Sequence, residues 1–327
     1  MEQRVLGRTA LQVSVLGLGC GAVGGLMVRG SAADQERAVA RALDAGITFF
    51  DTAPSYGEGR SEANLGRALA RVQGGRHALV ATKFTISAAN AGRVARAISE
   101  SLDESLGRLG RERVHVLQLH NAIGDDAATP GRSLPPIIVT DEVAGGLERE
   151  RAAGRIGWYG ITAVGDPAAV AAVVDSGAFH TAQVPFNLLN PTGSGILPHA
   201  AEREMGVIGI RALAGGALSG STWRHPIGMA EVVPIGTGAT YEDDVAAADR
   251  LQGIVGAGWA ETLAEAALRF AAFAPGASTA LIGVSTLEQL EAAIAAVERG
   301  PLPDAAIEAV EAAWGRISRD AQADAPR

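Results

Sequence analysis

Short apolar runs alternate along the whole chain with longer segments whose apolar residues recur at helical spacing. The apolar runs cover residues 13–18, 47–51, 78–83, 114–120, 156–162, 181–184, 207–211 and 279–283. The helical segments cover residues 34–45, 62–71, 91–109, 141–153, 167–176, 195–204, 262–274 and 287–296. Near-continuous apolar runs followed by helices are typical of parallel strands that are buried on both faces.

Eight strand–helix units in alternation predict an α/β fold, a (β/α)8 TIM barrel that forms a single domain over residues 1–327. Residues 4–13 predict an N-terminal β-hairpin that caps the bottom of the barrel, with Gly7 and Arg8 as its turn. Residues 304–317 predict a C-terminal helix over the barrel. Glycines that follow helices are expected in the left-handed conformation at Gly46, Gly110, Gly154, Gly177 and Gly206.

Two connections are longer than ordinary strand-to-helix loops. They cover residues 121–140 and 214–242, and both contain glycine and proline. Long connections inside a compact domain are usually functional. We therefore expect them to form the rim of a substrate pocket.

Composition narrows the class of protein. The chain has 47% hydrophobic and 20% charged residues, so a large core is expected and general disorder is not. The net charge of −8 and the lack of a basic stripe argue against nucleic acid and anionic membranes as partners. Cys20 stands alone, so no internal disulfide can form. With no long apolar run and no signal-like N-terminus, we expect a cytoplasmic protein with a small-molecule substrate; oligomeric state stays open.

Polar residues stand where three consecutive strands end. The second strand ends in Asp51, the third in Lys83 and the fourth in His120, while Tyr56 follows the second strand in "DTAPSYGEGRSE". Catalytic groups of (β/α)8 barrels come from the C-terminal ends of strands. Taken singly, such an aspartate, tyrosine or histidine is as readily structural. Lys83 is the only lysine among 28 basic residues, and four candidates at one mouth favour a shared catalytic role.

These four side chains suit proton transfer to a carbonyl oxygen. A tyrosine hydroxyl has a reference pKa of about 10, too high for ready proton exchange at neutral pH. An adjacent lysine ammonium is expected to lower the pKa of Tyr56, and a buried Asp51 carboxylate would keep Lys83 charged. His120 would orient the substrate oxygen. Arginine, with its wide planar fork, does not replace a compact ammonium here, which explains the single lysine.

The order of motifs resembles the aldo-keto reductase family over essentially the whole chain. The motifs are "GITFFDTAPSYGEGRSEANLGRAL", "VATKF", "VLQLHNA", "GITA", "AQVPFNLLNP", "GVIGI" and "LIGVSTLEQLEAAIAA". The resemblance implies a barrel that binds a nicotinamide dinucleotide and moves a hydride between the cofactor and a carbonyl carbon. It implies Tyr56 as the proton donor, Lys83 and Asp51 as the partners that set its pKa, and His120 as the substrate-orienting group.

The same resemblance implies a set of cofactor-binding positions. They are Gly19, Cys20, Gly21, Asp51, Thr162, Gln183, Arg211, Leu213, Gly283, Ser285, Thr286 and Gln289. Some positions depart from the family pattern: Ala163 replaces an asparagine, Ile210 replaces a stacking aromatic residue, and Gln289 replaces an arginine that pairs with the 2′-phosphate of NADP. The family as a whole favours NADP, with NAD as the alternative.

The substrate is expected to be an aldose, its lactol or a simple aldehyde. We expect Tyr56, His120, Phe84 and Trp223 to contact it, and no metal to take part. Two other functions stay open at this point. A Schiff-base aldolase would use Lys83 as the nucleophile, and a non-catalytic partner subunit would only bind the cofactor.

Overall fold

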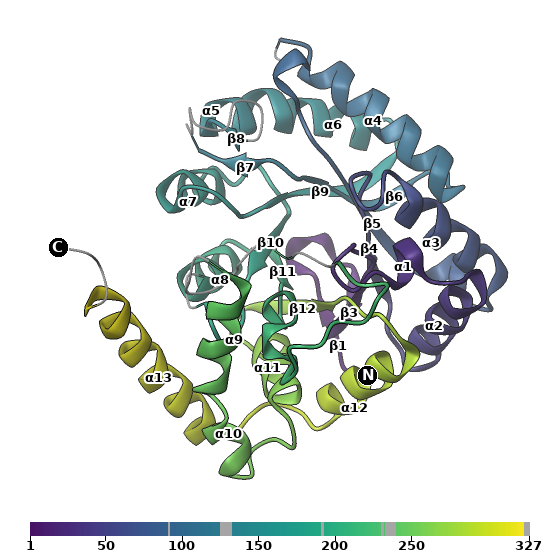
Figure 1. The fold of residues 1–327 in the computed structure, drawn as a ribbon. Helices are drawn as coiled ribbons and strands as arrows, with labels where there is room; N and C mark the ends of the chain where they lie inside the picture. Colours follow the sequence, from purple (N-terminus) through teal and green to yellow (C-terminus); the bar gives the residue numbers. More distant parts are fainter. Residues whose placement is uncertain (91, 125–132, 191–192, 230–231, 233–239, 324–327) are drawn as a thin grey trace.

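Eight parallel strands close into a barrel. The computed structural model describes residues 1–323 apart from 91, 125–132, 191–192, 230–231 and 233–239. The barrel strands, in spatial order, are β3 (Leu16–Gly19), β4 (Phe49–Asp51), β5 (Leu79–Phe84), β6 (Val114–Leu119), β9 (Ile156–Thr162), β10 (Thr181–Pro185), β11 (Gly206–Ile210) and β12 (Ala277–Ile282). Strand β12 pairs with β3 and closes the ring. The predicted (β/α)8 fold is confirmed (Figure 1).

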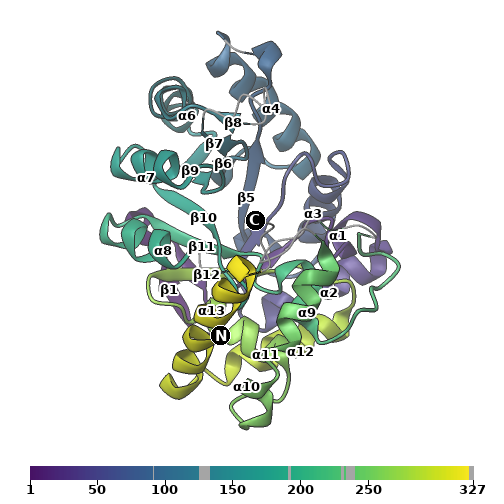
Figure 2. The same cartoon turned by 60° about the vertical axis from the view of Figure 1, so that its left-hand side comes forward.

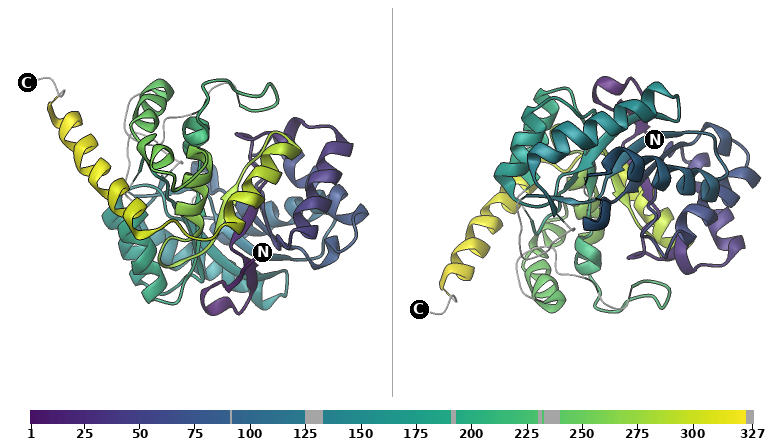
Figure 3. Two further views of the ribbon diagram at one scale, coloured as in Figure 1. Left: turned by 90° about the horizontal axis from the view of Figure 1, so that it is seen from below. Right: turned by 90° about the horizontal axis from the view of Figure 1, so that it is seen from above.

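Helices surround this ring on the outside, as the views in Figure 1 and Figure 3 show. The main ones are α2 (Ala32–Asp44), α3 (Arg60–Arg71), α4 (Val94–Leu109), α6 (Ala144–Ala152), α7 (Pro167–Asp175), α8 (Gly193–Glu202), α11 (Leu263–Ala272) and α12 (Leu287–Glu298). They match the eight predicted helices to within a few residues; residue 91, the predicted start of the third helix, lies outside the described residues. The barrel connections also carry α1 (Leu26–Arg29), α5 (Pro136–Ile138), α9 (Tyr241–Asp249) and α10 (Gly253–Gly256).

The two long connections contain short elements. The first holds β7 (Ala122–Ile123), β8 (Ser133–Leu134) and, after α5, a π-helical turn over Val139–Val143. The second opens with a 3-10 segment over Ala214–Ser219. Residues 125–132, 230–231 and 233–239 of these connections lie outside the described part of the chain.

Side-chain alternation along the strands divides the buried residues into two layers. Inside the barrel, one cluster holds Leu6, Val13, Phe49, Ala81, Val116, Ile208 and Leu281. A much larger cluster fills the space between barrel and helices and includes Phe50, Val80 and Phe84. Because successive strand residues point to opposite faces, Ala81 and Lys83 share the inner face of β5, while Val80 and Phe84 share the outer face.

The N-terminal hairpin forms as predicted, but its turn is longer than Gly7 and Arg8. Strands β1 (Gln3–Val5) and β2 (Gln12–Ser14) pair antiparallel, and a 3-10 turn over Gly7–Thr9 joins them. The predicted strand 13–18 is therefore split between this hairpin and β3. The turn packs closely against the residues at the start of β11. A Cβ on Gly7 would lie 2.2 Å from the Gly206 amide nitrogen, and the Arg8 amide donates to the Glu204 carbonyl at 2.7 Å.

Four of the five predicted helix-ending glycines adopt the left-handed conformation, with φ values of 82°, 62°, 76° and 68° at Gly46, Gly110, Gly154 and Gly177. The prediction for Gly206 is wrong. Glu204 takes the left-handed conformation instead, with φ 57°, and Gly206 begins β11. Glycine is needed at 206 for space, since a Cβ there would lie 2.5 Å from the Leu6 side chain.

The C-terminal helix α13 (Asp304–Ala323) is longer than the predicted 304–317. Its first part packs on the protein through the buried Ala306, Val310 and Ala313. The Trp314 indole nitrogen donates to the Leu188 carbonyl at 2.7 Å. Its far end stands clear of the barrel in Figure 1 and Figure 3, and in the view of Figure 2 the helix lies in front of the rest of the ribbon. No helix in the described part of the chain is long and apolar enough to cross a membrane.

Candidate active site

A buried ion pair lies at the C-terminal mouth of the barrel. The Lys83 ammonium donates to Asp51 Oδ2 at 2.5 Å and to the Thr52 carbonyl at 2.9 Å. The other Asp51 oxygen accepts from the Gln183 amide nitrogen at 2.6 Å. Lys83 is 1% exposed and Asp51 is 3% exposed. The strand ends β4, β5 and β10 thus bring three predicted site residues into one hydrogen-bonded group.

The ion pair keeps Lys83 charged. Burial alone lowers the pKa of a lysine, but the Asp51 carboxylate and the Tyr56 hydroxyl outweigh burial and raise the pKa of Lys83 above its ordinary value. Burial raises the pKa of Asp51, and the Lys83 charge opposes that rise. A lysine nucleophile needs the reverse arrangement, a lowered pKa and a free amine. This geometry argues against Lys83 as a Schiff-base residue.

Tyr56 lies between Lys83 and His120. The Lys83 ammonium is 4.8 Å from the centre of the Tyr56 ring, and the Tyr56 and His120 rings meet edge to face with centroids 5.9 Å apart. The Lys83 charge lowers the pKa of Tyr56, as predicted, but burial is the larger effect and the pKa is raised overall. The expectation of a net lowering is not met. In this state Tyr56 is a fully protonated phenol, a proton donor rather than a base.

His120 completes the cluster directly after β6. Its backbone amide donates to the Phe84 carbonyl at 2.9 Å, which fixes the residue at the mouth. Burial, followed by the nearby charges of Lys83 and Arg211, lowers the pKa of His120 to about 4. The imidazole is therefore neutral at pH 7 and offers one donor and one acceptor.

The loop that carries Tyr56 is held by buried polar contacts that the sequence gave no reason to single out. The Ser61 hydroxyl donates to the Cys20 carbonyl and lies 2.8 Å from the Thr52 hydroxyl. Thr52 also presents its carbonyl to Lys83. A backbone contact of this kind leaves no signature in the side chains, so the role of Thr52 could not be found from sequence.

The first barrel strand offers the predicted Gly19, Cys20 and Gly21. A Cβ on Gly21 would lie 3.8 Å from the Tyr56 ring, which places Gly21 beside the cluster. Cys20 is 1% exposed and burial raises the pKa of its thiol. Cys20 therefore presents its backbone to this loop and not a reactive thiolate.

Thr162 and Gln183 are neighbours in the register of β9 and β10. The Thr162 hydroxyl is buried and has no hydrogen-bond partner among the described residues. An orphaned buried hydroxyl beside the Gln183 amide fits a polar group such as the carboxamide of a nicotinamide ring. These residues thus fit the cofactor that the sequence resemblance implies.

Arg211 follows β11 with a left-handed backbone, φ 61°. Its charge acts on both Tyr56 and His120. Leu213 is half-buried and packs on the larger hydrophobic cluster. Arg211 therefore adds a positive charge to the mouth on the side of β11.

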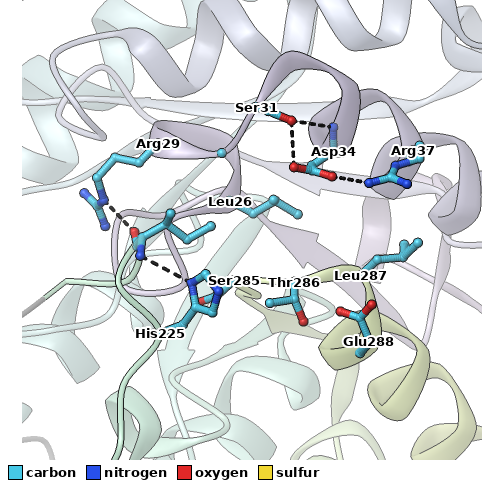
Figure 4. Close-up of a pocket in the computed structure, with 12 residues that line it drawn as sticks. Leu26, Arg29, Ser31, Asp34, Arg37, His225, Ser285, Thr286, Leu287 and Glu288 are labelled. Carbon is cyan, nitrogen blue, oxygen red and sulfur yellow. Dashed lines mark hydrogen bonds and ion pairs between the residues drawn. The ribbon is translucent and has the colours of Figure 1, made fainter.

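The last strand leads to a cavity of about 310 Å³ at the start of α12. Ser285, Thr286, Leu287 and Glu288 line one side, and residues from α1, α2 and the segment near His225 line the rest (Figure 4). Gly283 is exposed beside it. Gln289 turns back and accepts a hydrogen bond from the Ser285 amide at 2.7 Å.

The two predicted apolar walls of the substrate pocket lie elsewhere than expected. Phe84 is 1% exposed and belongs to the cluster between barrel and helices, since it follows Lys83 and points to the opposite face of β5. Trp223 is 67% exposed and stacks edge to face on His225, which lines the cavity at α12. Neither residue gains support as a substrate contact from this placement.

Comparison with known proteins agrees with the fold. The model of the aldo/keto reductase family matches residues 15–315. The chain belongs to the aldo/keto reductase family. Such reductases are NAD(P)H-dependent oxidoreductases that act on small molecules, so this chain is an enzyme of that class.

This aldo/keto reductase is similar in sequence or structure to the following three proteins. It is 26% identical over 306 residues to the aldo-keto reductase YhdN of Bacillus subtilis, covering 89% of this chain and 87% of that protein. It is 29% identical over 245 residues to a D-threo-aldose 1-dehydrogenase of Pseudomonas sp, covering 64% and 69%. The structure of the glycerol dehydrogenase AKR11B4 from Gluconobacter oxydans superimposes with a TM-score of 0.72 at 26% identity, covering 96% and 95%.

Among the described residues of this aldo/keto reductase, no group of three or more histidine, cysteine, aspartate or glutamate side chains is arranged to hold a metal ion.

Proposed function

We propose that this aldo/keto reductase interconverts the carbonyl group of a small polyhydroxylated molecule and the corresponding alcohol, with Tyr56 as the proton donor and acceptor. One observation carries the proposal. The half-buried Tyr56 ring lies 4.8 Å from the charged Lys83 ammonium and contacts the ring of neutral His120. A phenol between a cation and a neutral imidazole is suited to give its proton to a carbonyl oxygen.

The nicotinamide cofactor, when bound, supplies or accepts the hydride. Gln183 and Thr162 would hold its carboxamide, and the backbone of Gly19, Cys20 and Gly21 would lie along its ribose and pyrophosphate. The positions after the last two strands would hold the remainder: Arg211, Leu213, Gly283, Ser285, Thr286 and Gln289. The family resemblance of the sequence favours NADP, with NAD as the alternative.

The chain's own residues account for the proton. In the reducing direction the phenolic O–H bond of Tyr56 breaks and the proton passes to the substrate oxygen. The phenolate left behind gains stability from the Lys83 ammonium, because opposite charges at short range in a buried site interact strongly. Asp51 and the Thr52 carbonyl hold that ammonium in place. His120, being neutral, donates to the same substrate oxygen and fixes the direction of proton transfer.

Two relatives support a polyhydroxylated substrate. One is a D-threo-aldose 1-dehydrogenase and the other a glycerol dehydrogenase. Both names describe molecules that carry hydroxyl groups next to the reacting carbon. The exposed guanidinium of Arg211 and the neutral imidazole of His120 provide hydrogen-bond donors for such hydroxyls.

The test is turnover by the purified full-length chain. We expect oxidation of NADH or NADPH to depend on a small aldehyde or aldose, and the reverse reaction to depend on the corresponding alcohol or lactol. Borohydride treatment in the presence of substrate should leave Lys83 unmodified. A covalent adduct on Lys83 would instead favour an aldolase. Tight cofactor binding without turnover on any carbonyl compound would favour a non-catalytic subunit.

A further inference from the structure

We propose that the cavity at the start of α12 selects NAD(H) over NADP(H), with Glu288 as the residue that accepts a free ribose 2′-hydroxyl and repels a 2′-phosphate. The inference rests on the proposed function, because it assumes that a nicotinamide dinucleotide binds across the barrel mouth. It departs from the preference for NADP that the family as a whole suggests.

In (β/α)8 barrels the loops after the last strands and the helix start beside them commonly bind a phosphate group, and the cavity opens at that place. It is about 310 Å³ in volume and opens between the N-terminal turns of α2 and α12. Figure 4 shows Thr286 and Glu288 from α12 on one side, with Ser31, Asp34 and Arg37 from α2 opposite them. The Glu288 side chain is exposed to this space.

Three groups that could bind a phosphate at this helix start form hydrogen bonds within the protein instead. The Ser285 amide donates to the Gln289 side-chain oxygen at 2.7 Å, and the Ser285 hydroxyl donates to the Gly24 carbonyl at 2.5 Å. The Gln289 amide donates to the Thr286 hydroxyl oxygen at 3.3 Å. A phosphate gains its affinity for a helix N-terminus from free amides. Here a phosphate would have to displace three internal hydrogen bonds first.

The Glu288 carboxylate lies at the same helix start. Its own backbone amide and the Thr286 hydroxyl hold the pKa of Glu288 below its usual range, so the carboxylate is ionised at neutral pH. A phosphate monoester carries a charge of roughly −1.5 to −2 at pH 7. A like charge so near the helix start disfavours that ester. A 2′-hydroxyl, in contrast, can donate to the carboxylate, which is how acidic residues recognise NAD in other folds.

The positive charges around the cavity are engaged with other groups of the protein, and the Arg37 charge, which also lowers the pKa of Glu288, is shared with Asp34. Arg37 forms an ion pair with Asp34, which also accepts from the Ser31 hydroxyl at 2.6 Å. Arg29 donates to the Ile227 carbonyl at 2.5 Å and to the Ala22 carbonyl at 2.6 Å. In Figure 4 Arg29 lies at the opposite end of the cavity from Glu288. Its guanidinium thus ties the segment around Ile227 to the loop after β3.

Equilibrium binding of NADH and NADPH to the full-length chain tests the inference without any substrate. Quenching of the fluorescence of the four tryptophans reports binding. We expect NADH to bind at least about tenfold more tightly than NADPH, a difference of about 1.4 kcal/mol. Because the exposed charge of Glu288 is screened by salt, the preference should shrink as ionic strength rises from about 0.05 M to about 0.5 M.

Two variants test whether residues at the start of α12 cause the preference for NADH over NADPH. Glu288→Gln should strengthen NADPH binding about three- to tenfold, change NADH binding little and abolish the salt dependence. Gln289→Arg frees the Ser285 amide and adds a guanidinium, so it should also strengthen NADPH binding. The matched control is Glu298→Gln, which removes an exposed charge at the far end of the same helix and should change neither.

Tighter binding of NADPH than of NADH by the unmodified chain, or an unchanged ratio in both Glu288→Gln and Gln289→Arg, would overturn the selection proposed here and leave the hydride-transfer function standing. If neither NADH nor NADPH bound, the proposed function itself would be overturned. A melting curve for each variant separates loss of binding from loss of folding.

Discussion

Lys83 and Asp51 form an ion pair of 2.5 Å whose two side chains are almost completely buried. A buried pair seldom repays its desolvation through stability alone. The pair also fixes the ammonium 4.8 Å from the centre of the Tyr56 ring. Its position therefore accounts for the single lysine of a chain that otherwise uses arginine.

Two substitutions of Lys83 test whether turnover needs a positive charge of any shape or the compact ammonium in its place. We expect Lys83→Arg to lower kcat at least about a hundredfold, because a planar guanidinium cannot present one compact charge to both Asp51 and Tyr56. Lys83→Met should lower kcat as far and cost about 3–5 kcal/mol of stability, since it leaves the Asp51 carboxylate buried and unpaired. Steady-state kinetics and urea denaturation measure the two effects.

The matched control is the double variant Lys83→Met with Asp51→Asn. It removes both charges, so it should recover part of the lost stability without recovering turnover. A Lys83→Arg enzyme with nearly normal kcat would contradict the account.

Three partly buried histidines predict how stability depends on pH. Burial is the main cause that lowers the pKa of His115, His120 and His180 to about 4, from an ordinary value of 6.5. Between these two values the unfolded chain binds more protons than the folded chain. Stability is therefore present above about pH 6.5 and falls as the pH drops toward about 4. Each histidine contributes a slope of at most about 1.4 kcal/mol per pH unit.

Urea denaturation at several pH values between about 4.5 and 7.5 measures that slope. His120→Gln should reduce it by up to one histidine's share. His77, which is exposed, is the matched control, and His77→Gln should leave the slope unchanged. A slope for His120→Gln equal to that of the unmodified chain would show that His120 titrates normally.

Glu62 supplies a prediction about stability alone. It is 0% exposed and accepts from the Thr82 hydroxyl at 2.6 Å and from Arg108 at 2.7 Å, on the outer side of β5. Glu62→Ala should cost about 2–4 kcal/mol, because a buried hydroxyl and a guanidinium lose their acceptor. Cofactor binding by the folded fraction should not change.

The control for Glu62 is Glu104, which also pairs with Arg108 but is 71% exposed. Glu104→Ala should cost less than about 1 kcal/mol. Equal costs for the two variants, by urea denaturation, would refute the assignment of Glu62 as a buried anchor.

The alternation of apolar runs was sufficient to predict the barrel, because parallel strands buried on both faces have a distinct pattern. The strand-end position also predicted the meeting of Asp51, Lys83 and His120. What could not be predicted depends on packing between distant segments. Glu204, and not Gly206, takes the left-handed conformation, and residue 206 is glycine because Leu6 of the hairpin occupies the space that a Cβ would need.

The electrostatics of the site also could not be predicted from the sequence. Strand position and spacing placed Lys83 near Tyr56, but they did not show how strongly the surroundings of the tyrosine hydroxyl oppose its ionisation. Burial exceeds the effect of the ammonium, so the pKa of Tyr56 rises where the sequence suggested a fall. Likewise, Phe84 points to the outer face of β5 because it follows Lys83, which points to the inner face, and this became clear only with the strand register.

Turnover by Tyr56→Phe tests the central claim most directly. The substitution removes one hydroxyl and keeps the ring that contacts His120. We predict a fall in kcat of about 10²- to 10⁴-fold for reduction of a small aldose, with the dissociation constant of the reduced cofactor unchanged. A Tyr56→Phe enzyme that keeps more than about a tenth of normal turnover would contradict the claim that Tyr56 delivers the proton.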